Sequence, residues 1–548
     1  MNLKKLKFLI LPAAIILFMG FFKGDGDMYF QISKSIDIFG KVYKEISFNY
    51  VDEINPEEFM ISGINGMLAS LDPYTVFIDE KRREDIDLLT NGKYGGIGIS
   101  IGIRNNTITI VDLLDGYSAQ RQGLRIGDII LKVNDVEVNK DNFDEMSSLV
   151  KGDPGTEVKL KIKREEEDLV FNIIREEVKI KNLTYSGFIP ENSNNVYLKL
   201  TSFTRTAGDE IRKALLELKA EKPIASIVLD LRGNPGGLLD AAIDVCEKFL
   251  KKNQLIVSVM GRDTASAKKY YATEEPVADS AYLIVLVDSG SASASEIVAG
   301  AIQDHDRGVV LGTETFGKGL VQTVVPLSYN TSLKITTAKY YTPSGRCIQR
   351  IDYSQNNKVL PVVPGKNQVE YKTDNNRPVF AAGGIKPDTL VTNEMHIDII
   401  KELNAKGLIF KFATEYHNVY AAELFKADKD DNLYSKFKVF IANEKFDYKS
   451  TAETQLIDLI KTTEEGKYDQ TVVNTLREFR SRLKTNVTEE IDKYKKEVVI
   501  SLRNELLTRY EGQTGRIKGI LKNDIQFEKA LEIIRDKKLY YTLLAYNG

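Results

Sequence analysis

The sequence predicts a multidomain α+β protein, and three stretches of different pattern lead to this prediction. Residues 91–177 contain alternating or β-branched runs separated by glycine and asparagine turns, as in a small β-rich module. Residues 178–391 alternate apolar strands with amphipathic helices, which indicates a buried sheet with helices packed on it. Residues 392–548 are charged and helical in pattern. At roughly 150 residues per domain, a chain of 548 residues has room for three or four domains.

Composition excludes several functional classes. The chain carries 75 basic and 78 acidic residues, a formal net charge of -3, so no bulk positive field attracts nucleic acid. Its two cysteines, Cys246 and Cys347, lie far apart without a Cys/His cluster, which argues against a disulfide framework and a zinc site. With three histidines, His305, His396 and His417, the chain is poor in the usual metal ligand and general base. We therefore expect no metal, no cofactor and no nucleic-acid partner.

The N-terminus, residues 1–27, has the pattern of an export signal. Lys4, Lys5 and Lys7 precede an uncharged run over residues 8–22, which fits the n-region and h-region of a secretory signal peptide. No A-x-A-like cleavage site follows and no cysteine marks a lipid attachment, so an uncleaved membrane anchor is the alternative. A buried helix of the folded protein fits the pattern less well. We predict an exported protein, periplasmic or otherwise extracytoplasmic.

Residues 28–90 are predicted to be a helical N-terminal region. The stretch EEFMISGINGMLASL places apolar residues at helical spacing and ends at the turn LDPYT. This region leads into the β-rich module.

The β-rich module, residues 91–177, has the element order of a PDZ domain. A short helix over residues 118–122 leads through Gly123 and a Gly127-Asp128 turn to a strand, and a longer helix is expected over residues 142–150. PDZ domains add an extended peptide to a sheet edge and hold its terminal carboxylate with backbone N–H groups of a glycine-containing loop.

The candidate carboxylate loop is Gly96-Ile97-Gly98-Ile99. Glycines allow close backbone approach and the isoleucines would line an apolar pocket, so we expect protein or peptide ligands with apolar C-termini. A lone G-I-G-I sequence is more often a simple turn between strands. The spaced glycine and apolar residues of GLRIGDIILKVNDVEV, residues 123–138, favour the PDZ interpretation.

Two loops of the α/β region are the expected ligand sites. Ligands of such sheets collect in the loops that follow strand ends. DLRGNPGGLLD follows the strand at Ile227, and DSGSASASE follows the strand at Leu283. In the first loop, Asp230 and Arg232 are expected to hold the turn rather than to transfer protons.

The second loop places Ser293 at the start of a helix expected over residues 292–304. Free N–H groups and the helix dipole at such an end stabilise negative charge, so a serine there can be a nucleophile beside an oxyanion hole. Plain N-capping is the alternative, because serine is a preferred cap and Glu296 completes a capping-box pattern. This stretch alone favours the cap.

The stretch GTETFGKG, residues 312–319, has the G-x-x-x-x-G-K spacing of a phosphate-binding loop. Such a loop needs Ser or Thr after the lysine and a helix immediately afterwards. Residue 319 is glycine, and the following LVQTVVPL has the pattern of a strand. We therefore expect no nucleotide, and Lys318 is better explained as a proton acceptor.

The candidate base Lys318 can serve only if desolvation or a cationic neighbour lowers its pKa from about 10.4 toward neutrality. Gln322 would project from the same face of the predicted strand and could hydrogen-bond the amine without adding negative charge. A surface lysine beside a strand glutamine is the alternative. A histidine base is disfavoured, because residue 305 would lie about 18 Å along the helix from Ser293.

Five motifs together resemble a known family. DLRGNPGG, GSASASEIVAGAIQD, GTETFGKGLVQ, YYTPSGRCIQ and GGIKPD follow the PDZ-like module and the LDPYT segment in this order. Over about residues 30–391 the chain thereby resembles the C-terminal processing peptidases, also called tail-specific proteases. The resemblance implies a crotonase/ClpP-like α/β protease core with an inserted PDZ domain.

The resemblance also implies roles for individual residues. In that family the nucleophile is the middle serine of S-A-S-A-S-E, the base is the lysine of F-G-K-G, and a glutamine four residues later supports the lysine. These positions are Ser293, Lys318 and Gln322 in this chain. Backbone N–H groups of Ala294 and of a glycine in the G-G-L segment, Gly237 with Gly236 next to it, would form the oxyanion hole.

Residues 392–548 form a helical extension beyond the simplest family pattern. An Asn486-x-x-Glu489 cap precedes an apolar stripe. The stripe consists of Ile491, Tyr494, Val498, Leu502 and Leu506. Such a stripe needs a partner surface, and the alternatives are core packing or a satellite helical domain, self-association, and binding of an adaptor.

These observations predict a serine endopeptidase that captures apolar C-terminal tails of exported proteins through its PDZ domain and cleaves by a Ser-Lys acyl-enzyme mechanism. A catalytically silent PDZ scaffold on the same fold is the alternative, but it would need none of the three residues with implied catalytic roles. A crotonase-like acyl-thioester enzyme would explain neither the PDZ-like module nor the export signal. The domain order also suggests that the PDZ module gates the site when a tail binds.

Overall fold

The computed structural model describes most of the chain. The described residues are 25–545 without 81–91, 105, 264, 266, 354–359, 362–368, 393–396, 484 and 485. The uncharged run of the predicted signal or anchor, residues 8–22, lies outside them. Among the helices that are described, none has the length and apolar character needed to cross a membrane.

One compact unit of the chain combines residues 1–79 with residues 322–336 and 353–359. Its elements are α2 (Asp25–Asn49), α3 (Pro56–Leu68) and β1 (Val76–Ile78), and β1 pairs antiparallel with the first residues of β18 (Ser332–Tyr341). The side chain of Asn55 caps α3 by accepting a hydrogen bond from the N–H of Glu57 (3.0 Å). The helical pattern of the N-terminal region is therefore present as two helices.

The second unit, which holds the rest of the chain, contains the PDZ-like sheet. Its strand order is β3-β4-β5-β7-β8 with β6 paired to β5, and all these pairs are antiparallel. Alternate residues of each strand fill the core, as Val158, Leu160 and Ile162 of β7 do. The elements are β2 (Lys93–Gly96), β3 (Ile99–Arg104), β4 (Thr107–Leu113), α5 (Ser118–Arg121), β5 (Ile129–Val133), β6 (Val136–Glu137), η2 (Lys140–Asn142), α6 (Phe143–Val150), β7 (Glu157–Arg164), β8 (Glu167–Ile174) and β9 (Glu176–Lys179), which pairs with β2.

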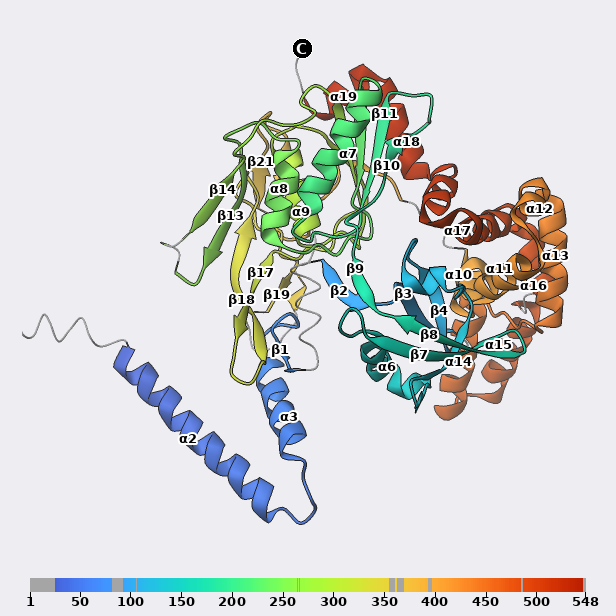
Figure 1. Cartoon of the computed structure of the whole chain (residues 1–548), viewed down its shortest axis with the longest axis horizontal. Helices are drawn as coiled ribbons and strands as arrows, with labels where there is room; N and C mark the ends of the chain where they lie inside the picture. Colours follow the sequence, from blue (N-terminus) through green and yellow to red (C-terminus); the bar gives the residue numbers. More distant parts are fainter. Residues whose placement is uncertain are drawn as a thin grey trace, which may run out of the picture. The chain divides into compact units, whose positions relative to one another are not determined.

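A six-stranded sheet forms the centre of the α/β region. Its order is β10-β11-β12-β15-β16-β23, and all neighbours are parallel except β10 and β11. Helices α7, α8 and α9 cover one face, and α18 and α19 cover the other (Figure 1). The bounds are β10 (Leu183–Phe188), β11 (Asn195–Leu200), α7 (Ala207–Glu221), β12 (Ser226–Asp230), α8 (Leu239–Glu247), β15 (Tyr282–Val287), α9 (Ala294–Asp304), β16 (Val309–Gly312), β23 (Thr389–Leu390), α18 (Ile525–Arg535) and α19 (Lys537–Leu543).

The strands of this sheet are apolar on both faces because both faces are covered. In β15, Leu283 and Val285 belong to the core under α7, α8 and α9, whereas Ile284 and Leu286 belong to the core under α18 and α19. Successive side chains of a strand point to opposite faces, so a strand buried twice needs a continuous apolar run. The run AYLIVLV in the sequence therefore indicates a strand covered on both sides.

One apolar run of the α/β region forms a strand that lies outside the central sheet. The run LIVSVM forms β13 (Leu255–Gly261), which pairs antiparallel with β14 (Lys268–Tyr271) and with the last residues of β18. Its apolar pattern resembles that of the central strands, so the pattern by itself could not assign it to a sheet. The remaining strands are β17 (Leu320–Pro326), β19 (Ile351–Asp352), β20 (Leu360–Pro361), β21 (Glu370–Lys372) and β22 (Pro378–Phe380).

The C-terminal region is helical, as predicted, and it contributes to two cores. Helices α10 to α13, α16 and α17 contribute to one apolar cluster, and the whole predicted stripe lies in it or packs against it. The stripe is broken at Tyr494, which separates two helices, and the side chain of Asn486 caps the first of them. α18 and α19 pack on the central sheet instead. The bounds are α10 (Asp398–Ala405), α11 (Leu408–Val419), α12 (Ala422–Ala427), α13 (Asp430–Asn443), α14 (Thr451–Glu465), α15 (Gln470–Leu483), α16 (Val487–Lys493) and α17 (Lys495–Leu521).

Candidate active site

The loops that follow β12 and β15 are joined by hydrogen bonds. The Asp288 carboxylate accepts from the N–H of Gly233 (2.8 Å), and the Ser291 hydroxyl donates to the carbonyl oxygen of Leu231 (2.8 Å). The N–H of Ala292 donates to the carbonyl oxygen of Asn234 (3.0 Å). Because β12 and β15 are parallel neighbours, their ends lie at the same edge of the sheet and bring the two loops together.

Ser293 stands at the N-terminus of α9 with a strained backbone. Its φ and ψ are 53° and -111°, a conformation that side-chain-bearing residues rarely adopt. Gly236 of the neighbouring loop lies against it with φ 99°. A Cβ at position 236 would come within 2.6 Å of the Ala292 carbonyl oxygen and 2.9 Å of the Ala294 nitrogen. The close approach therefore requires glycine at position 236.

The three predicted oxyanion donors differ in what their N–H groups do. The N–H of Gly236 donates to the side-chain oxygen of Asn234 (2.9 Å). Among the described residues, the N–H groups of Gly237 and Ala294 have no acceptor. The Ala294 N–H lies in the first turn of α9, where the helix dipole favours negative charge. Of the three predicted donors, Gly237 and Ala294 thus keep N–H groups that the described residues do not engage.

Glu296 joins the backbone of Ser293 to that of Lys318. Its fully buried carboxylate accepts from the N–H groups of Ser293 (2.9 Å) and Lys318 (2.9 Å). It also accepts from the Gly317 N–H (2.7 Å) and the Thr315 hydroxyl (2.5 Å). Burial raises the pKa of Glu296 to about 7, although these hydrogen bonds lower it. The capping pattern in the sequence pointed to the bond with Ser293 but not to the bonds with the lysine loop.

Tyr340 of β18 holds the same two residues from the carbonyl side. Its hydroxyl donates to the Lys318 carbonyl oxygen (2.6 Å) and lies 3.2 Å from the Ser293 carbonyl oxygen. Burial, followed by the negative charge of Glu296, raises the pKa of Tyr340 well above its usual value, so the hydroxyl keeps its proton. Nothing in the local sequence YYTPSGRC distinguishes this tyrosine, because its partners lie far away along the chain.

Lys318 is half-buried between two glycines. The Gly319 N–H donates to the side chain of Gln349 (2.6 Å), and the Gly317 carbonyl oxygen accepts from the N–H of Arg350 (2.9 Å). β17 begins at Leu320, directly after this segment. A strand rather than a helix follows the lysine, as the sequence predicts, so this segment differs from a phosphate-binding loop, in which a helix begins directly after the lysine.

Gln322 lies in β17 and belongs to the first unit. Its side-chain amide donates to the hydroxyl of Thr336 (3.2 Å), and that hydroxyl in turn donates to Asp72 (3.2 Å). Asp72 also accepts from the N–H of Tyr74 (2.9 Å). The turn LDPYT of the sequence is thus bound to Thr336 of β18, and the predicted support of Lys318 by Gln322 stays a prediction.

Three other residues weighed in the sequence, His305, Asp230 and Arg232, have structural partners. The ring nitrogens of His305 lie 2.7 Å from the Leu255 carbonyl oxygen and 2.8 Å from the Asp374 carboxylate. Arg232 donates from its N–H (2.9 Å) and its Nε (3.0 Å) to Asp230. These contacts agree with the structural roles expected for His305 and for the Asp230 and Arg232 turn.

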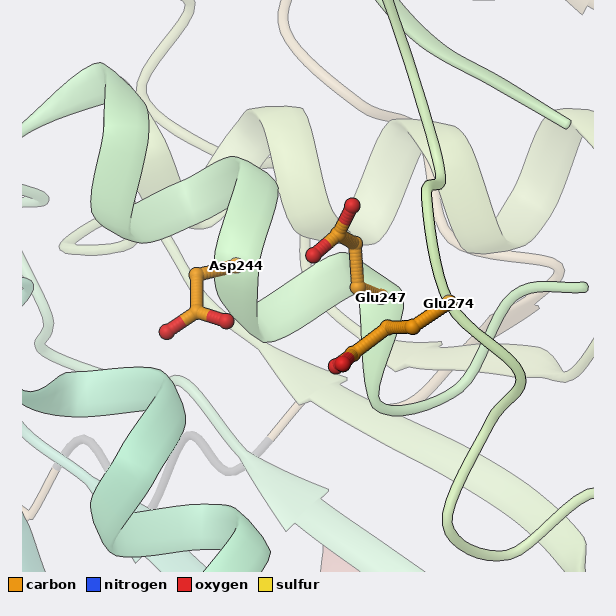
Figure 2. A group of neighbouring side chains, drawn as sticks. All are labelled: Asp244, Glu247 and Glu274. Atoms are coloured by element: carbon orange, nitrogen blue, oxygen red, sulfur yellow. The ribbon is translucent and has the colours of Figure 1, made fainter. Parts of the chain in front are cut away.

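A cluster of three carboxylates lies on α8 and the loop after β14. Figure 2 shows Asp244 and Glu247 on the helix with Glu274 beside them. The ammonium group of Lys248 lies 2.7 Å from Glu274 and also pairs with Asp244, while Arg212 pairs with Glu274. Asp244 and Glu274 are thus paired with cations, whereas the Glu247 carboxylate accepts from the N–H (2.7 Å) and the hydroxyl (2.8 Å) of Thr273. Two of the three carboxylates therefore belong to an ion-pair network.

The predicted carboxylate loop of the PDZ module has two free donors. Among the described residues, the N–H groups of Ile97 and Gly98 have no acceptor, while the carbonyl oxygen of Ile97 accepts from Ala119 (3.1 Å). Gly98 has φ 80°, which favours glycine. Ile97 is 1% exposed and Ile99 packs on the same core, so Ile97 fills the module rather than lining an open pocket as expected. Gly96 pairs with Glu176 in the β2–β9 ladder.

Comparison with known proteins agrees with this arrangement. Peptidase family S41 matches residues 194–359, the PDZ domain family matches residues 109–164, and the family described as probable PDZ-protease, C-terminal helical domain, matches residues 399–534. A carboxy-terminal-processing protease of Bartonella bacilliformis is 37% identical over 340 residues, which cover 61% of this chain and 77% of that protein. The carboxy-terminal processing protease CtpB of Bacillus subtilis is 32% identical over 452 residues, 81% of this chain and 89% of that protein.

Among solved structures, the photosystem II D1 C-terminal processing protease is 25% identical, with 65% of this chain and 92% of that chain covered at a TM-score of 0.36. The sequence relatives carry the assignment, because they are more than 30% identical and are covered over most of their length. The chain belongs to the carboxy-terminal-processing proteases of peptidase family S41 and is a serine-type endopeptidase.

Proposed function

We propose that this protease cleaves peptide bonds with Ser293 as nucleophile and Lys318 as general base. The observation that supports the proposal most directly is the shared clamp of Glu296 and Tyr340 on the backbones of the two residues. A nucleophile and a base must keep a constant separation during the reaction. Residues that bind both backbones at once meet that need.

The chemistry would proceed through an acyl-enzyme. The neutral amine of Lys318 takes the proton of the Ser293 hydroxyl as the oxygen attacks the substrate carbonyl carbon. The tetrahedral oxyanion accepts hydrogen bonds from the N–H groups of Ala294 and Gly237. Lys318 then gives the proton to the leaving amine, and a water molecule activated by the same lysine hydrolyses the ester. Gln322 would support the lysine amine without adding charge.

We further propose that the PDZ module selects chains with apolar C-termini. The free N–H groups of Ile97 and Gly98 can bind a terminal carboxylate. In the described part of the module, β3 is an edge strand that pairs only with β4. Its other edge can therefore accept an extended peptide. The substrates would be exported proteins, in keeping with the predicted signal at residues 1–27.

The test uses the full chain and a loosely folded protein substrate with an apolar C-terminus, followed by mass spectrometry. Ser293→Ala and Lys318→Ala should each abolish cleavage and retain tail binding. Ser289→Ala and Lys386→Ala are matched controls, because both side chains are exposed, and they should cleave normally. Cleavage by Ser293→Ala would contradict the assigned nucleophile. Equal cleavage of a substrate that ends in aspartate would contradict the proposed tail selectivity.

Export can be tested separately. We expect the protein outside the cytoplasm after cell fractionation, and sequencing of its N-terminus distinguishes a cleaved signal from a retained anchor. A protein found only in the cytoplasm would contradict the proposal.

A further inference from the structure

An ion pair joins the first loop of the active site to the C-terminal helices. The guanidinium Nη2 of Arg232 lies 2.6 Å from Asp230 and 2.7 Å from Asp524, the residue that precedes α18. Its Nη1 donates to the side-chain oxygen of Gln526 (2.8 Å). The side chains of Arg232 and Asp524 are 13% and 2% exposed, so the pair is largely shielded from water. A shielded charged pair with several hydrogen bonds holds one geometry firmly.

Asp524 performs two tasks with its two carboxylate oxygens. Oδ1 accepts from the N–H groups of Gln526 (3.0 Å) and Phe527 (3.1 Å) and so caps α18. Oδ2 binds Arg232. The Gln526 side-chain amide also donates to the carbonyl oxygen of Val391 (2.7 Å), next to the end of β23. The start of α18 is therefore bound to Arg232 through the side chains of Asp524 and Gln526.

Arg232 begins the segment that ends at the oxyanion glycines. Its carbonyl oxygen accepts from the ammonium group of Lys199 (2.8 Å), and the next residue, Gly233, is bound by Asp288. Asn234 lies two residues after Arg232, and its side chain accepts from the N–H of Gly236 (2.9 Å). Gly236 in turn lies against the turn at Ser293. Arg232, Gly233, Asn234 and Gly236 of this segment are each bound by a neighbour, so a shift of Arg232 would be passed along it.

We propose that Asp524 is a positioning residue of the active site, which sets the placement of the Gly236-Gly237 segment through Arg232. The C-terminal helices would then be required for transition-state stabilisation as well as for packing on the sheet. The proposal rests on the proposed function, because it assumes that the N–H of Gly237 stabilises the oxyanion. It assigns to the C-terminal region a task in the chemistry that no local motif reveals.

The test variant is Asp524→Asn in the full chain. Asparagine is as good an N-cap as aspartate, so α18 keeps its cap while the negative charge that faces Arg232 is lost. We expect kcat to fall about tenfold or more with KM within about twofold, because an oxyanion donor acts in the transition state. Inhibition by a peptide aldehyde, whose adduct with the serine carries an oxygen at the oxyanion position, should weaken by the same factor as kcat.

The matched control is Asp536→Asn. Asp536 caps the next helix through the N–H of Leu539 (3.0 Å) and, among the described residues, makes no ion pair, so this variant should retain wild-type kcat. Gln526→Met, which keeps the buried volume and removes the hydrogen bond to Arg232, should lower kcat in the same sense. Wild-type kcat in either Asp524→Asn or Gln526→Met would overturn the proposal.

Two further readouts separate the possible failures. A loss of activity that equals the unfolded fraction, measured by circular dichroism at the assay temperature, would make Asp524 a purely structural residue and overturn the proposal. Cleavage that persists in Ser293→Ala would instead show that the proposed nucleophile is wrong. If Ser293→Ala is inactive and Asp524→Asn is fully active, the proposed function stands and only the positioning role is lost.

Discussion

The backbone N–H of Lys318 donates a 2.9 Å hydrogen bond to the buried carboxylate of Glu296, whose other contacts include the N–H of Ser293. Glu296, which the sequence predicts as part of a helix-capping box, therefore also joins two loops of the active site. This relationship makes Glu296 and the residues around it accessible to direct tests.

Glu296→Gln should lower both activity and stability. All four groups that point at the carboxylate are donors, and the amide NH2 of glutamine would face at least one of them. We expect a loss of about 1 to 3 kcal/mol in the free energy of unfolding, the usual cost of an unsatisfied buried polar group. kcat should fall more than tenfold, because the Ser293 and Lys318 loops lose their common anchor. Urea titrations and steady-state kinetics measure the two effects, and an unchanged kcat would contradict the anchoring role.

The same variant should change the pH dependence of stability. The pKa of Glu296 is raised from 4.5 to about 7, so the folded protein holds a proton that the unfolded chain has lost between these pH values. The contribution of Glu296 to the free energy of unfolding is therefore full below about pH 4.5 and falls by up to about 1.4 kcal/mol per pH unit as the pH rises to about 7. From pH 5 to pH 8 the wild type should lose stability relative to Glu296→Gln. If the free energies of unfolding of the two proteins, measured in urea, changed with pH in parallel, Glu296 would not titrate in this range.

Tyr340→Phe should reduce activity with a modest effect on stability. The variant removes the hydroxyl that binds the Lys318 carbonyl oxygen and keeps the buried ring. We expect about 1 kcal/mol lower stability, the typical net value of one hydrogen bond, and about tenfold lower kcat from a misplaced lysine. Tyr341→Phe on the other face of β18 is the control and should behave as wild type. Equal kcat in all three proteins would exclude a role for the Tyr340 hydroxyl.

Gly236→Ala should abolish cleavage. The new Cβ would meet the Ala292 carbonyl oxygen and the Ala294 nitrogen at less than 3 Å in a backbone with φ 99°. The loop must move away from Ser293, and we expect at least a hundredfold loss of kcat, as for removal of an oxyanion donor. Gly233→Ala separates this contact from backbone strain, because Gly233 also has positive φ but has nothing within 4 Å of its Cβ position. If Gly233→Ala lost as much activity as Gly236→Ala, the close contact would not be the cause.

Phe527→Ala should destabilise the protease core from the far end of the sequence. Phe527 is 3% exposed in the core that α18 and α19 form with the central sheet. Its ring lies edge-on to that of Tyr197, with the ring centroids 5.3 Å apart. Truncation of such a ring costs about 3 to 5 kcal/mol. Phe479→Ala is the control, since its side chain is 55% exposed, and it should change stability by about 0.5 kcal/mol or less. Thermal unfolding measures both variants, and equal midpoints would show that α18 adds little to the core.

Much of the architecture could be predicted because it depends on local pattern. The PDZ-like order, the helix after Ser293 and the strand after Lys318 follow from turn residues and from periods of two or 3.6 residues. The sheet to which β13 belongs could not be predicted from pattern, since an apolar run looks alike in either sheet. The sequence also could not show that the C-terminal helices contribute to two separate cores. An amphipathic stripe indicates that a partner surface exists but not which surface it is.

The sequence by itself determined the order of modules, the family and the candidate residues Ser293 and Lys318, because short motifs with fixed spacing encode turns and helix ends. Only the tertiary structure decided what holds these residues in place. Glu296 reaches Lys318 across 22 positions, Tyr340 reaches Ser293 across 47, and Arg232 reaches Gln526 across 294. Contacts between such distant positions arise from how sheets and helices pack, and a polar side chain gives no local sign of the partner it will meet.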